Sequence, residues 1–67
     1  MKIYNEAKDK SIRLFHKDST QTTVSRAEWD WVEITTTESG FGLLIYNKSC
    51  DTACWYNLNE LLYFLLD

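Results

Sequence analysis

The sequence predicts a small α+β domain, in which an antiparallel sheet of four to five strands packs with a short helical segment and a C-terminal helix. Three observations predict this fold class. Short runs rich in β-branched and aromatic residues fill most of the chain, which is typical of strands. The turns between them are left to Asn, Asp, Ser, Lys and two glycines, because the chain has no proline. The last apolar run follows a good helix N-cap.

The first predicted element is a hairpin over about residues 2–16. A polar break at residues 7–10 separates two short apolar runs, and it reads as the turn. In the second run apolar and polar residues alternate, which places Ile12, Leu14 and His16 on one face of a strand.

The middle of the chain carries two conflicting signals. Ser25 and Glu28 have the spacing of a capping box, which predicts a short helical segment near residues 26–30. The following residues are rich in Val, Ile and Thr, which favours a strand from about Trp31 to Thr37 over a longer helix. Both elements are predicted, and the sequence leaves open whether residues 25–33 are helix or strand.

Two further hairpins are predicted over about residues 31–47 and 41–57. Ser39 and Gly40 have the chemistry of a tight hairpin turn, and a compact apolar strand follows them. Turn-forming residues after that strand predict that the chain then returns as its antiparallel neighbour.

The final predicted element is a helix over about residues 60–66. Asn59 is a good N-cap, and Glu60 suits the positive end of a helix. Helical spacing directs one set of leucines toward the sheet. These are Leu58, Leu61, Leu62 and Leu65. Tyr63 and Leu66 would then lie on the outer face of the helix, free to meet another chain.

The length and the charge of the chain limit the functions that it can have. A chain of 67 residues supports one core, so residues 1–67 form a single predicted domain. The formal charge is −3, and it is unevenly spread: the first 17 residues hold five bases and two acids, whereas the remaining 50 hold two bases and eight acids. This distribution argues against nucleic acid as the main partner, because non-specific affinity for phosphates comes from clustered Lys and Arg. A basic protein surface fits the acidic part better.

The sequence predicts no catalytic residue, metal or cofactor. Cys50 and Cys54 lack the second ligand pair of a zinc site, and they are too few for the disulfide framework of a secreted domain. His16 is the one histidine, and it lies at a predicted strand end rather than beside a nucleophile. No apolar run is long enough for a membrane span, and the first residues lack the apolar stretch of a signal peptide. The expected protein is a cytoplasmic non-enzyme with reduced thiols.

An acidic stretch with interleaved aromatic residues is the strongest candidate for a binding surface. The large rings and carboxylates of residues 28–33 cannot all face one small core. Tryptophan is enriched at interface hot spots, and carboxylates steer a basic partner. The alternative, in which Trp29 and Trp31 both fill the core, stays open. The predicted partner-binding residues are Glu28, Trp29, Asp30, Trp31, Glu33, Glu38, Tyr63 and Leu66.

The leading functional prediction is a small acidic binding protein that occupies a basic surface of another protein. In size and charge the chain is similar to the accessory proteins of phages and mobile elements that block host enzymes, which implies an inhibitor of a host nucleic-acid-handling enzyme or complex. One alternative is an assembly subunit that forms a homo-dimer or larger homo-oligomer through the C-terminal helix and a sheet edge. A second is a nucleic-acid binder that uses the basic N-terminal hairpin. Its contact residues would be Lys8, Lys10, Arg13, Phe15 and Lys17.

Overall fold

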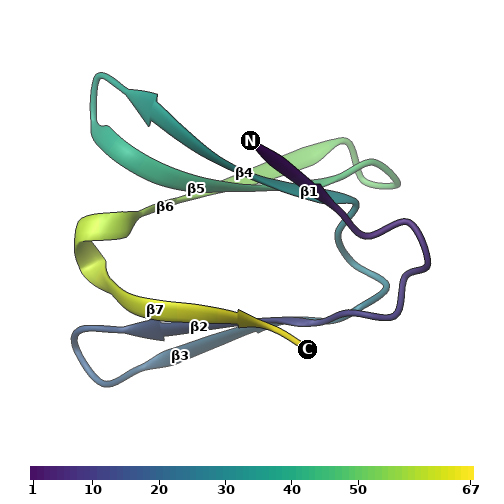
Figure 1. The fold of residues 1–67 in the computed structure, drawn as a ribbon, viewed down its shortest axis with the longest axis horizontal. Coiled ribbons are helices and arrows are strands. Elements are labelled where there is room, and N and C mark those ends of the chain that lie inside the picture. Colours follow the sequence, from purple (N-terminus) through teal and green to yellow (C-terminus); the bar gives the residue numbers. More distant parts are fainter.

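The computed structural model describes all 67 residues and shows a protein built almost entirely of strands. Seven strands and one short 3-10 helix follow one another along the chain (Figure 1). They are β1 (Lys2–Tyr4), β2 (Ile12–His16), β3 (Gln21–Val24), β4 (Trp31–Thr37), β5 (Gly40–Asn47), β6 (Thr52–Asn57), η1 (Leu58–Glu60) and β7 (Leu61–Leu66). The predicted α+β class is therefore wrong, and the domain is all-β.

The strands form two antiparallel sheets that face each other as a sandwich (Figure 1). The four-stranded sheet has the order β1-β4-β5-β6, and the three-stranded sheet has the order β3-β2-β7. Three connections cross between the sheets: the loop after β1, the loop before β4, and η1 between β6 and β7. The chain holds no helix of the length and apolarity that a membrane crossing requires.

The core lies between the two sheets and is made by alternate residues of the strands. Ile12 and Leu14 project into it from β2, and Leu43 and Ile45 project into it from β5. The remaining buried members are Trp29, Val32 and Leu61. Partly buried apolar residues pack around this cluster. They are Ile3, Val24, Tyr56, Leu58, Phe64 and Leu66.

The predicted helical segment near residues 26–30 is a turn, and Trp29 explains why. The Trp29 side chain is 0% exposed, and its indole N–H donates to the Lys10 carbonyl at 2.7 Å. Asn5, which is also buried, donates from its side-chain amide to the carbonyls of Arg26 and Trp29 at 2.8 and 3.1 Å. These contacts lock the two loops that cross between the sheets. The capping signal at Ser25 yields one turn only, in which the Glu28 N–H donates to the Ser25 carbonyl at 2.9 Å.

The predicted C-terminal helix is also wrong, because residues 61–66 form strand β7 against β2. A six-residue helix has little stability of its own, since nucleation is costly. As a strand the same residues gain a ladder with β2 and still bury Leu61. The period of two then turns Leu66 toward the core, whereas Leu65 lies on the outer face and stays partly exposed. Both placements are the reverse of the helical expectation.

The two later hairpins are confirmed, and the first is not. The β4–β5 pair runs in register from Trp31 opposite Tyr46 to Thr37 opposite Gly40, and β5 pairs with β6 in turn. The predicted hairpin over residues 2–16 does not form, because β1 pairs with β4 while β2 pairs with β3 and β7. Asn5 ties the intervening loop to the connection before β4, so β1 and β2 end in different sheets.

Candidate interaction surface

The outer face of the four-stranded sheet carries a row of large aromatic residues. Trp31 lies opposite Tyr4 on one side and Tyr46 on the other, so these three side chains share a face. Leu44 lies opposite Trp55 on the same face. The intervening residues of β4 and β5 point into the core, so this set points away from it. We call Tyr4, Trp31, Leu44, Tyr46 and Trp55 the aromatic face.

The centre of the aromatic face is a stacked pair of rings. The centroids of Trp31 and Tyr46 lie 5.0 Å apart, with 24° between the ring planes. The ammonium group of Lys2 lies 4.3 Å from the centroid of the Trp31 ring, in the geometry of a cation–π contact. Tyr4 extends the row toward the sheet edge and is 57% exposed. The sheet therefore presents a ring surface that already accepts one cation.

Trp55 covers the position of Gly42, which lies in the neighbouring strand. A Cβ atom built on Gly42 would lie 1.9 Å from Nε1 of Trp55, so glycine is needed for the indole to lie against the backbone. The indole N–H is buried in this position and has no hydrogen-bond partner. Because Gly42 has no side chain, the Trp55 indole can lie against β5, and this contact fixes Trp55 at the end of the aromatic face.

Asp30 lies where β4 begins and joins three parts of the chain. Its carboxylate accepts hydrogen bonds from the Lys8 ammonium group and from the backbone N–H of Lys48. Its own N–H donates to the Tyr46 carbonyl at 2.7 Å. The Lys8 hydrogen bond, followed by that of Lys48, holds the pKa of Asp30 below its ordinary value. Asp30 is therefore occupied by structural contacts within the chain.

Acidic residues border the aromatic face. Glu33 lies between Lys2 and Leu44 in the register of the sheet. The Tyr46 hydroxyl donates to the Asp51 carboxylate at 3.0 Å, and this hydrogen bond raises the pKa of Tyr46. Glu38 lies farther away, in the exposed turn at the opposite end of β4 from Trp31. The border also contains two bases, Lys2 and the exposed Lys48, so its charge is mixed.

The structure brings only part of the predicted binding set together. Asp30, Trp31 and Glu33 lie together at the start of β4. Trp29 is in the core, which excludes it from any surface, and Leu66 points inward toward the core. The other members, Glu28, Glu38 and Tyr63, lie apart from the aromatic face. Glu28 lies in the loop after β3, and Tyr63 projects from the other sheet, where its ring stacks on Phe15 at a centroid distance of 4.5 Å.

Sequence reasoning missed the aromatic residues that other strands contribute. Tyr4, Tyr46 and Trp55 were assigned to strands but not to a surface. The available signal was in β5, where apolar residues occupy both strand faces at residues 43–46. When both faces of a strand are apolar, one face lies in the core, and the other face is a candidate for a binding surface. Which neighbours share that second face depends on register, and register was not predictable.

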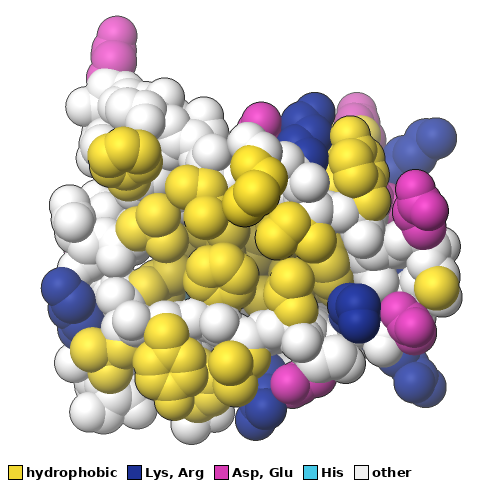
Figure 2. Space-filling view, viewed as in Figure 1, with side chains coloured by type: hydrophobic (Ala, Val, Ile, Leu, Met, Phe, Trp, Pro, Cys, Tyr) yellow, Lys and Arg dark blue, Asp and Glu magenta, His cyan; other side chains and the backbone are white.

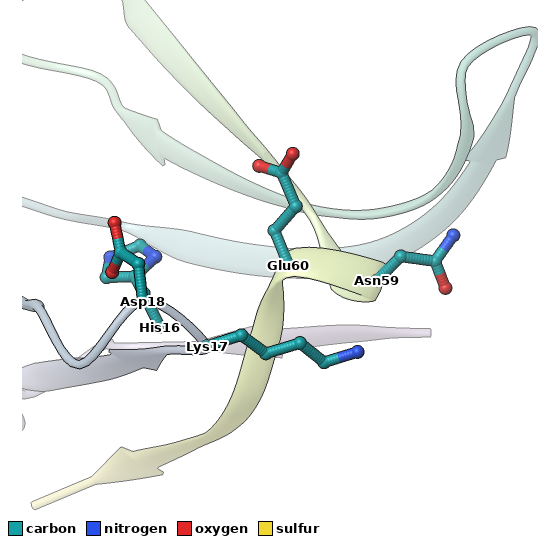
Figure 3. A pocket seen from close by; sticks show the side chains of 5 residues that line it. All are labelled: His16, Lys17, Asp18, Asn59 and Glu60. Atoms are coloured by element: carbon teal, nitrogen blue, oxygen red, sulfur yellow. The ribbon is translucent and has the colours of Figure 1, made fainter.

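A hollow of about 310 Å³ lies at the other end of the sandwich and is lined only by polar residues (Figure 3). These residues are His16, Lys17, Asp18, Asn59 and Glu60. Figure 3 shows their side chains pointing in different directions, with Glu60 and Asn59 diverging, rather than converging on one point. Nε2 of His16 lies 2.8 Å from the Thr22 hydroxyl. The arrangement provides no nucleophile beside a base, and nothing in it organises a reaction.

The cysteines and the basic residues of the first strands form no site either. Cys50 and Cys54 are free and exposed, and the chain has no group of three His, Cys, Asp or Glu side chains that could hold a metal ion. Lys8 is paired with Asp30, and Arg13 is paired with Asp67 at 2.6 Å. Two of the four bases proposed for nucleic-acid contact are therefore neutralised within the chain, and Phe15 is stacked against Tyr63.

The fold and this surface together define a small all-β sandwich with one aromatic sheet face. Comparisons with protein-family models, with curated proteins and with solved structures found no match for the chain.

Proposed function

We propose that this protein is a non-enzymatic binding domain that docks its aromatic face onto a basic surface of another protein. One observation carries the proposal: Trp31 and Tyr46 stack on a sheet face that no other element of the chain covers, with Lys2 already placed over the Trp31 ring. Both rings are half-buried by their neighbours on the sheet, and large rings on an open sheet face are typical of an interface core.

The chemistry of the aromatic face favours a partner with exposed arginine or lysine. A partner guanidinium can stack on Trp31 or Tyr46 as the Lys2 ammonium does, and Arg makes this contact more often than Lys. Glu33 lies beside the stack in register and supplies a countercharge. The net charge of −3 adds long-range attraction toward such a partner. An aromatic centre with a charged border is the usual arrangement of a protein–protein interface.

A basic surface that binds this face is of the kind with which proteins contact nucleic-acid phosphates. Occupying it would compete with nucleic acid, so the proposed role is that of an inhibitor of a nucleic-acid-handling protein. We place this encounter in the cytoplasm, which fits the two free, exposed cysteines.

A comparative capture experiment tests the proposal. Immobilised wild-type protein, Trp31→Ala and Tyr63→Ala would be exposed to lysate of the source cell at low and high salt, and bound proteins would be quantified by mass spectrometry. Tyr63→Ala is the matched control, since Tyr63 is an exposed aromatic residue on the opposite sheet. We expect a basic protein that wild type and Tyr63→Ala retain, that Trp31→Ala loses, and that high salt releases. Equal capture by all three proteins would contradict the proposal.

A further inference from the structure

Strand β7 forms an edge of the three-stranded sheet, and its outer side has no neighbour. It pairs with β2 alone, and β2 lies between β3 and β7. The strand reads LLYFLL, so it contains no charge, no glycine and no proline. Edge strands in soluble proteins are normally protected by such residues, because an exposed edge is a template for pairing with another strand. None of those residues is present along β7, and a bulge at Leu62 is the one protective feature that the strand has.

The direction of the backbone groups shows what this edge offers. The N–H of Asp67 donates to the Ser11 carbonyl at 2.9 Å, so the backbone of residue 67 points toward β2. Hydrogen-bonding groups alternate along an antiparallel strand, which turns the N–H and C=O of Phe64 and Leu66 away from β2. Leu62 is the unpaired residue of a bulge beside the same edge and is 63% exposed. Unpaired donors and acceptors thus lie along an apolar strand.

The sandwich is open along the side where β7 lies. Strand β1 is drawn near the viewer with β7, and it covers only Trp31–Glu33 of β4 (Figure 1). Residues 34–37 of β4 therefore lack a neighbour on that side. Figure 2 shows hydrophobic side chains gathered between the two sheets in this view. Ile34 and Phe41 are among the exposed apolar residues, so apolar surface continues beyond the edge of β7.

We infer that β7 pairs antiparallel with β7 of a second copy of this chain, so that two three-stranded sheets join into one of six strands. Identical strands that pair antiparallel are related by a twofold axis, which closes the assembly as a dimer and leaves neither edge free. Apolar side chains adjoin the new ladder along its length.

The charges at the two ends of β7 suit a second copy. Arg13 and Asp67 form an ion pair at the C-terminal end, while the backbones of Lys17 and Glu60 meet at the N-terminal end, where the Lys17 N–H donates to the Glu60 carbonyl at 3.0 Å. Antiparallel pairing places the N-terminal end of β7 in one copy beside the C-terminal end of β7 in the other. Each end carries one acid and one base, so the pairing brings mixed rather than like charges together, and no charge falls within the apolar part of the strand.

This dimer does not rest on the proposed function. The aromatic face belongs to the other sheet and points away from the sandwich, so it stays accessible in both copies. A dimer would present two such faces on one particle.

Sedimentation equilibrium over a wide range of concentration tests the inference, with hydrogen exchange as a second readout. The mass should rise toward twice the chain mass of 7.9 kDa and go no further. The amide hydrogens of Phe64 and Leu66 should exchange more slowly as the protein is concentrated. Leu62→Lys places a charge on the exposed edge without touching the core and should remain at the chain mass. Ala53→Lys adds the same charge on β6, an edge of the other sheet, and should still form the dimer.

A synthetic chain that is methylated at the backbone nitrogen of Leu66 serves as a second variant, because it removes one outward donor and keeps every side chain. It should also remain at the chain mass. A wild-type protein that stays at the chain mass throughout would overturn the inference. So would open-ended aggregates, loss of the dimer on Ala53→Lys, or protection confined to residues 34–37, which would place the contact on β4.

Discussion

Asp30 shows at the residue scale how a surface acid can be structural. Its position between two tryptophans predicted a steering charge, whereas its carboxylate binds Lys8 and the backbone of Lys48. The contacts could not be foreseen, because the three residues are distant in sequence and meet only after both sheets form. Trp29 is a similar case. Its burial depends on a hydrogen bond to the Lys10 carbonyl, which no local pattern indicates.

The lowered pKa of Asp30 predicts a loss of stability in acid. A carboxyl group whose pKa is lower in the folded state stabilises the fold above its unfolded pKa, here the ordinary value of 3.8. That contribution disappears as the pH falls through the still lower folded pKa. Asp30→Asn should therefore unfold at lower denaturant concentration than wild type at pH 7, and the difference should vanish toward pH 2, by denaturant titration followed by circular dichroism.

Glu28→Gln is the matched control, since it removes a carboxylate from an exposed loop. Its stability relative to wild type should change little with pH. A difference between wild type and Asp30→Asn that is constant from neutral to acid pH would show that the Lys8 contact does not depend on ionised Asp30.

At the scale of elements, the sequence predicted the strands whose partners are adjacent in the chain. Strands β4, β5 and β6 carry β-branched and aromatic runs separated by short turns, so local signals agree with their pairing. The C-terminal run was misassigned because its apolar residues fit a helix or a strand equally. Its partner β2 lies about fifty residues earlier in the chain, and only that long-range contact decides between the two.

Because β7 is a strand, Leu61 and Leu65 should contribute unequally to stability, whereas in a helix they would contribute equally. Leu61 is buried in the core, whereas Leu65 is 39% exposed on the outer face of the sheet. Leu61→Ala should cost about 2–5 kcal/mol through lost burial and a cavity, while Leu65→Ala should cost about 1 kcal/mol or less. Denaturant melts at a low protein concentration would measure both. On one face of a helix the two leucines would be equivalent, so equal losses would contradict the strand.

At the scale of the whole molecule, a sandwich this small has two sheets but only one shared core. The inner faces are buried against each other, and each outer face remains open to solvent. Charged residues would normally cover such faces, yet the four-stranded sheet presents rings instead. The sequence of residues 28–33 predicted that some large rings lie outside the core. It did not predict that they gather on one sheet, because that follows from register.

The most direct test of the aromatic face is an NMR titration that resolves the three tryptophan indole N–H signals. The probe is a short arginine-rich peptide, with a glutamate-rich peptide of equal length as the control. We expect the arginine peptide to shift the signals of Trp31 and Trp55 and to leave that of Trp29 in place, because Trp29 is buried and its indole N–H is bound to the Lys10 carbonyl. Unchanged Trp31 and Trp55 signals, or equal shifts with the glutamate-rich peptide, would contradict this placement of the binding surface.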